Sequence, residues 1–178
     1  MELLGFAFIV IFGTLGHFIF EWSGHRRWAG TFFAVNESTW EHIKLTIYPS
    51  FIWMVVELCV RGASWSIVVA QCAAMLVMMA AIPAIFYSYT AIAGRNFLIA
   101  DIFCYVISVA AGMWVFSLVA PLSAGPALGI IAALVLAAIA VMYFRFSYHP
   151  PHCLLFRDPV SGHFGPQGHD CHSHFHQL

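Results

Sequence analysis

Five long apolar segments alternate with short polar stretches along the chain. An α-helix rises 1.5 Å per residue, so about 20 apolar residues cross a hydrocarbon core of roughly 30 Å. The polar stretches contain Gly, Ser, Arg and Pro residues, which typically end helices. The pattern therefore predicts an all-α bundle of five transmembrane helices, at residues 3–22, 36–60, 65–89, 97–118 and 127–146.

The second predicted helix begins with polar residues. Asn36 is a suitable N-cap, and Glu37, Glu41, His42 and Lys44 follow within the first two turns. Ionisable groups at membrane depth are costly in contact with lipid, so we expect several of these side chains to face other helices.

The last part of the chain has a different composition. From Tyr148 onward it is rich in Pro, Gly and His and lacks helical periodicity, which is typical of an irregular tail. We therefore divide the chain into a transmembrane domain at residues 1–147 and a tail at residues 148–178.

Composition supports the membrane class. Hydrophobic residues make up 62% of the 178 residues and charged residues 8%, and the mean hydropathy is +0.87. Soluble domains carry roughly 25% charged residues. The net charge of -1 leaves no basic surface for several phosphates, so we do not expect nucleic acid as a partner.

The arginines are distributed unevenly between the two sides of the predicted bundle. The side opposite the tail carries Arg61. By the positive-inside rule, the Arg-rich side is cytoplasmic, which puts the amino terminus outside and the carboxyl terminus inside a bacterial-type inner membrane. The arginines on the predicted cytoplasmic side are Arg26, Arg27, Arg95, Arg145 and Arg157.

Ionisable residues from several predicted helices reach a similar depth near the cytoplasmic side. Imidazoles and carboxylates that converge there can hold a divalent metal such as zinc, and histidine can also pass protons near neutral pH. Glu41 and Asp101 are candidate acceptors of a proton from metal-bound water. The candidate metal ligands are His17, Glu21, His42 and His149.

A purely structural role explains the same residues. Glu41 and Lys44 can form an interfacial ion pair, His17 can bond a neighbouring carbonyl, and Asp101 can hold two helices together. The sequence leaves both readings open.

The His-rich end of the tail is a second candidate metal site. Such tracts bind zinc, copper or nickel by composition, and an incidental polar tail or a partner contact are the alternatives. The candidate ligands are His169, Cys171, His172, His174 and His176.

Two segments resemble a family of small uncharacterised prokaryotic multi-pass membrane proteins. One is Asn-Glu-Ser-Thr-Trp-Glu-His-Ile-Lys-Leu at residues 36–45, followed by Pro49. The other is Pro-Pro-His-Cys-Leu-Leu-Phe-Arg-Asp-Pro at residues 150–159, followed by Gly162 and Gly165. The resemblance implies no activity.

A more distant likeness is to the membrane hydrolases that include alkaline ceramidases and adiponectin receptors. Those proteins hold zinc with a Ser-x-x-x-His pattern, an Asp on another helix and histidines on a late helix. Ser38 and His42 resemble the first element, and Asp101 the second. The resemblance implies a catalytic role for Ser38, but five helices replace seven. His17 and His149 would have to supply the missing ligands.

These observations favour an inner-membrane protein with a metal-binding polar site, acting as a zinc-dependent hydrolase of a lipid or another amphiphile. Membrane lipids are then its surroundings and the source of its substrate. A small transporter or proton-coupled carrier is the first alternative, and a non-catalytic scaffold or partner subunit is the second. The oligomeric state stays open.

Overall fold

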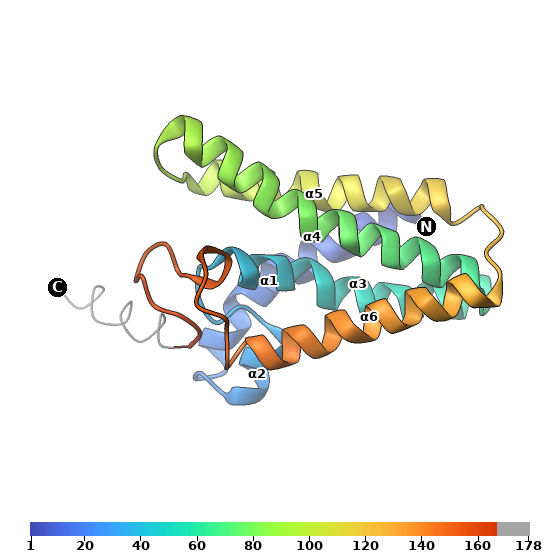
Figure 1. Ribbon diagram of the computed structural model, residues 1–178, viewed down its shortest axis with the longest axis horizontal. Helices are drawn as coiled ribbons and strands as arrows, with labels where there is room; N and C mark the ends of the chain where they lie inside the picture. The colour runs from blue at the N-terminus through green and yellow to red at the C-terminus, as the bar shows by residue number, and fades with distance from the viewer. Residues whose placement is uncertain (167–178) are drawn as a thin grey trace.

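The computed structural model describes residues 1–166, and the predicted tail ligands from His169 to His176 lie outside this range. The described residues are all-helical, apart from an isolated bridge between Arg157 and Phe164. Figure 1 shows the long helices side by side in one bundle. The elements are α1 (Glu2–Trp22), α2 (Arg27–Phe32), α3 (Thr39–Arg61), α4 (Trp65–Ala93), α5 (Leu98–Val119), α6 (Pro126–Phe146) and the 3-10 helix η1 (Leu154–Phe156).

The prediction of five long apolar helices is confirmed. α1, α3, α4, α5 and α6 are each long and apolar enough to cross a membrane. This is the architecture of a multi-pass membrane protein. α4 lies against α3, α5 and α6, while α1 packs against α3 and α5.

Two helix boundaries differ from the prediction by more than one residue. The second long helix starts at Thr39, with Ser38 rather than Asn36 as its N-cap, and the Ser38 hydroxyl accepts a hydrogen bond from the Glu41 amide at 3.4 Å. α4 continues past residue 89 to Ala93, and its C-cap Gly94 has a φ of 73°, in the left-handed region that glycine tolerates.

The short helix α2 was not predicted. It lies at one end of the bundle, where its backbone receives bonds from distant elements (Figure 1). Lys44 Nζ donates to the Gly30 carbonyl at 3.0 Å, and the Tyr148 hydroxyl donates to the Arg27 carbonyl at 2.5 Å. α2 therefore depends on tertiary contacts rather than on local propensity.

The described part of the predicted tail folds back onto the end of the bundle. Phe156 of η1 packs on Trp40, with ring centroids 4.5 Å apart, and Trp40 stacks on Tyr143 of α6. The Asn36 side chain donates to the Gly165 carbonyl at 2.8 Å. The end of the described chain thus holds the loop that leads into α3.

Candidate functional site

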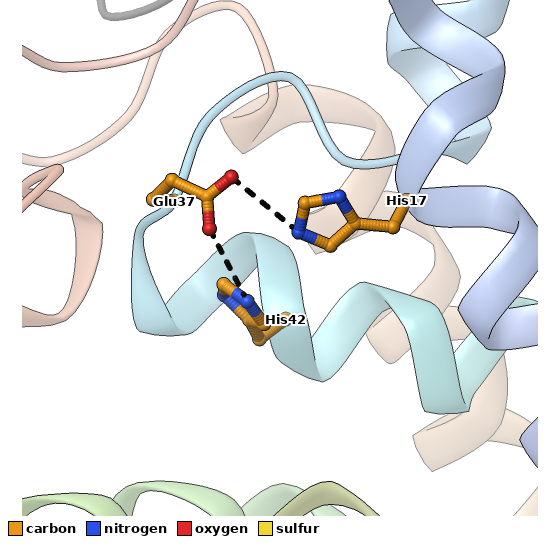
Figure 2. Close-up of side chains that lie close together, drawn as sticks. All are labelled: His17, Glu37 and His42. Carbon is orange, nitrogen blue, oxygen red and sulfur yellow. Dashed lines mark ion pairs between the residues drawn. The ribbon is translucent and has the colours of Figure 1, made fainter. Parts of the chain in front are cut away.

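Three side chains from two elements and a loop meet near one end of the bundle. His17 extends from the last part of α1, His42 from the first turns of α3, and Glu37 from the loop before α3. Figure 2 shows the Glu37 carboxylate between the two imidazoles. All three side chains are partly buried. We call this group the His-Glu-His cluster.

The spacing of the cluster suits a metal ion. His17 Nε2 lies 3.4 Å from Glu37 Oε1, and His42 Nε2 lies 3.6 Å from Glu37 Oε2. The three ligand atoms lie within 4.8 Å of one another. Ligands at about 2.0–2.1 Å from a tetrahedral zinc ion are roughly 3.4 Å apart. The two His–Glu distances are close to this value but run to different oxygens of Glu37, so a single ion would require a small movement of the side chains.

A hydrogen bond to the backbone fixes which nitrogen of His42 carries a proton. His42 Nδ1 lies 3.0 Å from the Ser38 carbonyl, which can only accept, so Nδ1 is the donor. Neutral His42 therefore presents the lone pair of Nε2 to the Glu37 carboxylate, which also only accepts. A cation between these two atoms, either a metal ion or a proton, satisfies both acceptors.

A cavity adjoins the cluster. It has about 60 Å³ open to the centres of water molecules. This is room for at least one water molecule. Glu37 and His42 line one part of it, and Asp101 and Asn96 another; Thr39, Ile82, Phe86, Cys104, Tyr105, Pro159 and Val160 complete the lining.

Asp101 is held by two donors at this cavity. It lies in the first turn of α5, and its carboxylate accepts hydrogen bonds from the Tyr89 hydroxyl and, at 3.3 Å, from the Asn96 amide. The two donors hold the carboxylate in one orientation. Asp101 thus brings a second acidic group to the cavity that the cluster lines.

Glu41 and Ser38, the other predicted catalytic residues, have structural contacts. Glu41 is buried and forms an ion pair with Lys44 Nζ at 2.6 Å, and it also accepts from the Val35 amide at 3.0 Å. Ser38 caps α3 and orients His42 through its carbonyl. Glu41 and Ser38 therefore stabilise the start of α3, from which His42 extends.

Two of the four predicted metal ligands lie outside the cluster that the described residues form. Glu21 is exposed in the last turn of α1, and His149 is exposed just after α6. The structure brings together His17 and His42 and adds Glu37, which was not among the predicted ligands.

The comparison with family models gives one match, to a family of unknown function, DUF6512, over residues 2–166. The chain belongs to the DUF6512 family. No curated protein and no solved structure matches the chain. The DUF6512 match includes the whole His-Glu-His cluster and all of the cavity lining, but it assigns no activity to either.

Proposed function

We propose that this DUF6512 protein is a divalent-metal-dependent membrane hydrolase, with zinc as the metal, that acts on a lipid or another amphiphile. The observation that carries the proposal is the pair of acceptors in the cluster. The hydrogen bond from His42 Nδ1 to the Ser38 carbonyl leaves the lone pair of Nε2 facing the Glu37 carboxylate. A bound cation relieves the repulsion between the lone pair and the carboxylate.

The donor set agrees with a catalytic rather than a structural zinc site. Two imidazoles and one carboxylate supply three ligands, which is the usual number where a fourth position stays open for water. Zinc bound in this way lowers the pKa of a coordinated water to about 7. The cavity beside Glu37 and His42 gives room for that water and for a reacting group.

Asp101 is our candidate for moving the proton. It lines the same cavity, and its two donors hold it in a fixed orientation. In the proposed hydrolysis the hydroxyl of water bonds to a carbonyl or phosphoryl centre, and the bond to the leaving group breaks. Asp101 takes the proton of the water and returns it to the leaving group.

A proton carrier is the second candidate, because a proton between Glu37 and His42 satisfies the same acceptors. The far half of the bundle supports this reading less well. There the ionisable Glu57 is held by Arg61 Nε at 2.5 Å and by the Trp53 indole at 3.1 Å, so it is committed to an ion pair.

Metal analysis of the purified protein separates these candidates. We expect about one zinc per chain in the full-length protein, and retention of it when residues 167–178 are deleted, since the cluster lies within residues 1–166. His42→Gln should lower zinc affinity at least about tenfold, because an amide is a poor substitute for imidazole.

His149→Gln is the matched control, because His149 is exposed and outside the cluster. It should keep the wild-type metal content. Equal metal loss in both variants would contradict the metal site. So would a wild-type protein that holds no metal and whose thermal stability is unchanged by zinc or chelator, and this result would favour the proton carrier.

We further propose that the cluster lies at the cytoplasmic end, in an inner membrane. The support is the Arg-rich end of the bundle, while Arg61 at the opposite end is neutralised by ion pairs with Glu57 and Glu2. A reporter active only in the cytoplasm should give signal when fused after Leu178 and none in the loop near Ser123. The reverse pattern would overturn the orientation.

A further inference from the structure

A second, larger pocket lies beside the cavity of the cluster. It has about 400 Å³ of space, within the range of small-molecule sites. The two pockets share Thr39, Phe86, Asn96 and Pro159. A molecule that fills the larger pocket therefore reaches the wall of the smaller one. The remaining residues that line the larger pocket are Tyr87, Thr90, Arg95, Leu154 and Arg157.

The charges of the two pockets are opposite. The larger one is lined by two arginines and by no carboxylate among the residues that the structure describes, whereas Glu37 and Asp101 line the smaller one. Within residues 1–166, no carboxylate forms an ion pair with Arg95 or Arg157. The two guanidinium groups therefore keep their charge available for an anion.

The contacts of these arginines leave most of their N–H donors available. Arg157 Nε donates to the Gly162 carbonyl at a long 3.4 Å, and the Arg95 guanidinium lies 4.7 Å from the centre of the Phe97 ring. Each guanidinium carries five donors in a planar fork that matches phosphate oxygens. Thr39 and Tyr87 add hydroxyl groups to the same pocket, 3.2 Å apart.

The larger pocket lies at the ends of two of the long apolar helices. Arg95 follows directly after Gly94, the C-cap residue of α4, and Thr39 is the first residue of α3. In a bilayer, lipid headgroups lie at the ends of membrane-spanning helices, just outside the hydrocarbon core. His42 lies about one helical turn deeper along α3.

We propose that Arg95 and Arg157 bind the phosphoryl group of an anionic amphiphile and so present it to the His-Glu-His cluster. This inference rests on the proposed function, because it defines the substrate of that site as a phosphorylated amphiphile. The headgroup lies in the larger pocket, and the bonds next to the phosphate lie at the wall shared with the smaller one.

Ligand binding to the full-length protein in detergent tests this inference. Calorimetric titration compares dioctanoyl phosphatidic acid, dioctanoylglycerol, which lacks the phosphate, and inorganic phosphate. A chelator removes divalent metal from the samples, so that no ligand is hydrolysed and the measured ligand binding does not depend on metal. The variants are Arg95→Gln and Arg95→Gln with Arg157→Gln. Arg145→Gln is the matched control, because Arg145 is exposed at the end of α6 and lines neither pocket.

We expect phosphatidic acid to bind at least about tenfold more tightly than dioctanoylglycerol, and the double variant to lose that preference. Arg145→Gln should retain it. Competition by millimolar inorganic phosphate would indicate that free phosphate also binds in the larger pocket. Failure to compete would assign the pocket to lipid headgroups. Either result supports the phosphoryl site. An unchanged double variant, no preference in the wild type, or equal loss in Arg145→Gln would overturn it.

Measuring the zinc content of the variants distinguishes a failure of this inference from a failure of the proposed function. The double variant should hold as much zinc as the wild type, because neither arginine belongs to the cluster. Wild-type protein with zinc but no phosphate preference would overturn the phosphoryl site alone. Phosphate preference without zinc would overturn the metal-dependent function and leave an anion site.

Discussion

Replacing Lys44 with methionine should lower the free energy of unfolding by about 3–5 kcal/mol, because it leaves the buried Glu41 carboxylate without its partner. The ammonium group of Lys44 also donates to the Gly30 and Phe33 carbonyls, at 3.0 and 3.2 Å. Loss of these two hydrogen bonds should also release α2 from the bundle. Thermal and denaturant unfolding in detergent measure the change.

An exposed ion pair on the same protein is the control. Glu2 and Arg61 meet at 2.9 Å but are 45% and 34% exposed, so Glu2→Gln should cost less than about 1 kcal/mol. Combining Lys44→Met with Glu41→Leu removes both buried charges and should recover much of the lost stability. A Lys44→Met protein as stable as Glu2→Gln would show that the buried pair contributes little.

Asp101→Asn should lower hydrolysis by about 10²–10⁴-fold while the zinc content stays at the wild-type level, if Asp101 transfers the proton. The amide keeps the shape of the side chain but cannot accept a proton at neutral pH. The measurement is product release from a panel of ester, amide and phosphoester amphiphiles, with zinc content determined on the same samples.

Glu21→Gln is the matched control for this loss of a carboxylate. Glu21 is exposed and outside both the cavity lining and the cluster, so its variant should keep full activity and full zinc. Comparable activity in Asp101→Asn and wild type would reject the proton-transfer role. No hydrolysis by zinc-loaded wild type on any substrate of the panel would contradict the hydrolase assignment.

The five long helices could be predicted from the sequence because a membrane span has to satisfy its backbone internally over a fixed thickness. That constraint acts through length and hydropathy, which are local properties. α2 has no such signal, since its position depends on Lys44 and Tyr148 from distant parts of the chain. Its formation could not be predicted from residues 27–32 alone.

The candidate site was predicted in part. The positions of His17 and His42 along their helices place them at a similar depth, and the structure brings them together. Depth does not determine which way a side chain faces around the helix axis, so Glu21 and His149 were included although they lie outside the cluster. Glu37 was not among the predicted ligands because the sequence pattern places it inside the second helix rather than in the loop before it.

One sequence signal could have found Glu37. Ser38 lies three residues before Glu41, which is the spacing of a capping box and indicates that the helix starts after Ser38. Glu37 then falls in the preceding loop, where the backbone can turn its carboxylate toward α1, as in the structure.

The hydrogen bond between the Asn36 side chain and the Gly165 carbonyl has a consequence for biosynthesis. It joins positions 129 residues apart, and it holds the loop next to Glu37. During translation α1 and α3 enter the membrane long before Gly165 has been made, since synthesis runs at about 5–20 residues per second. The loop next to Glu37 can therefore form this bond only after residue 165 has been synthesised, well after α1 and α3 have been inserted.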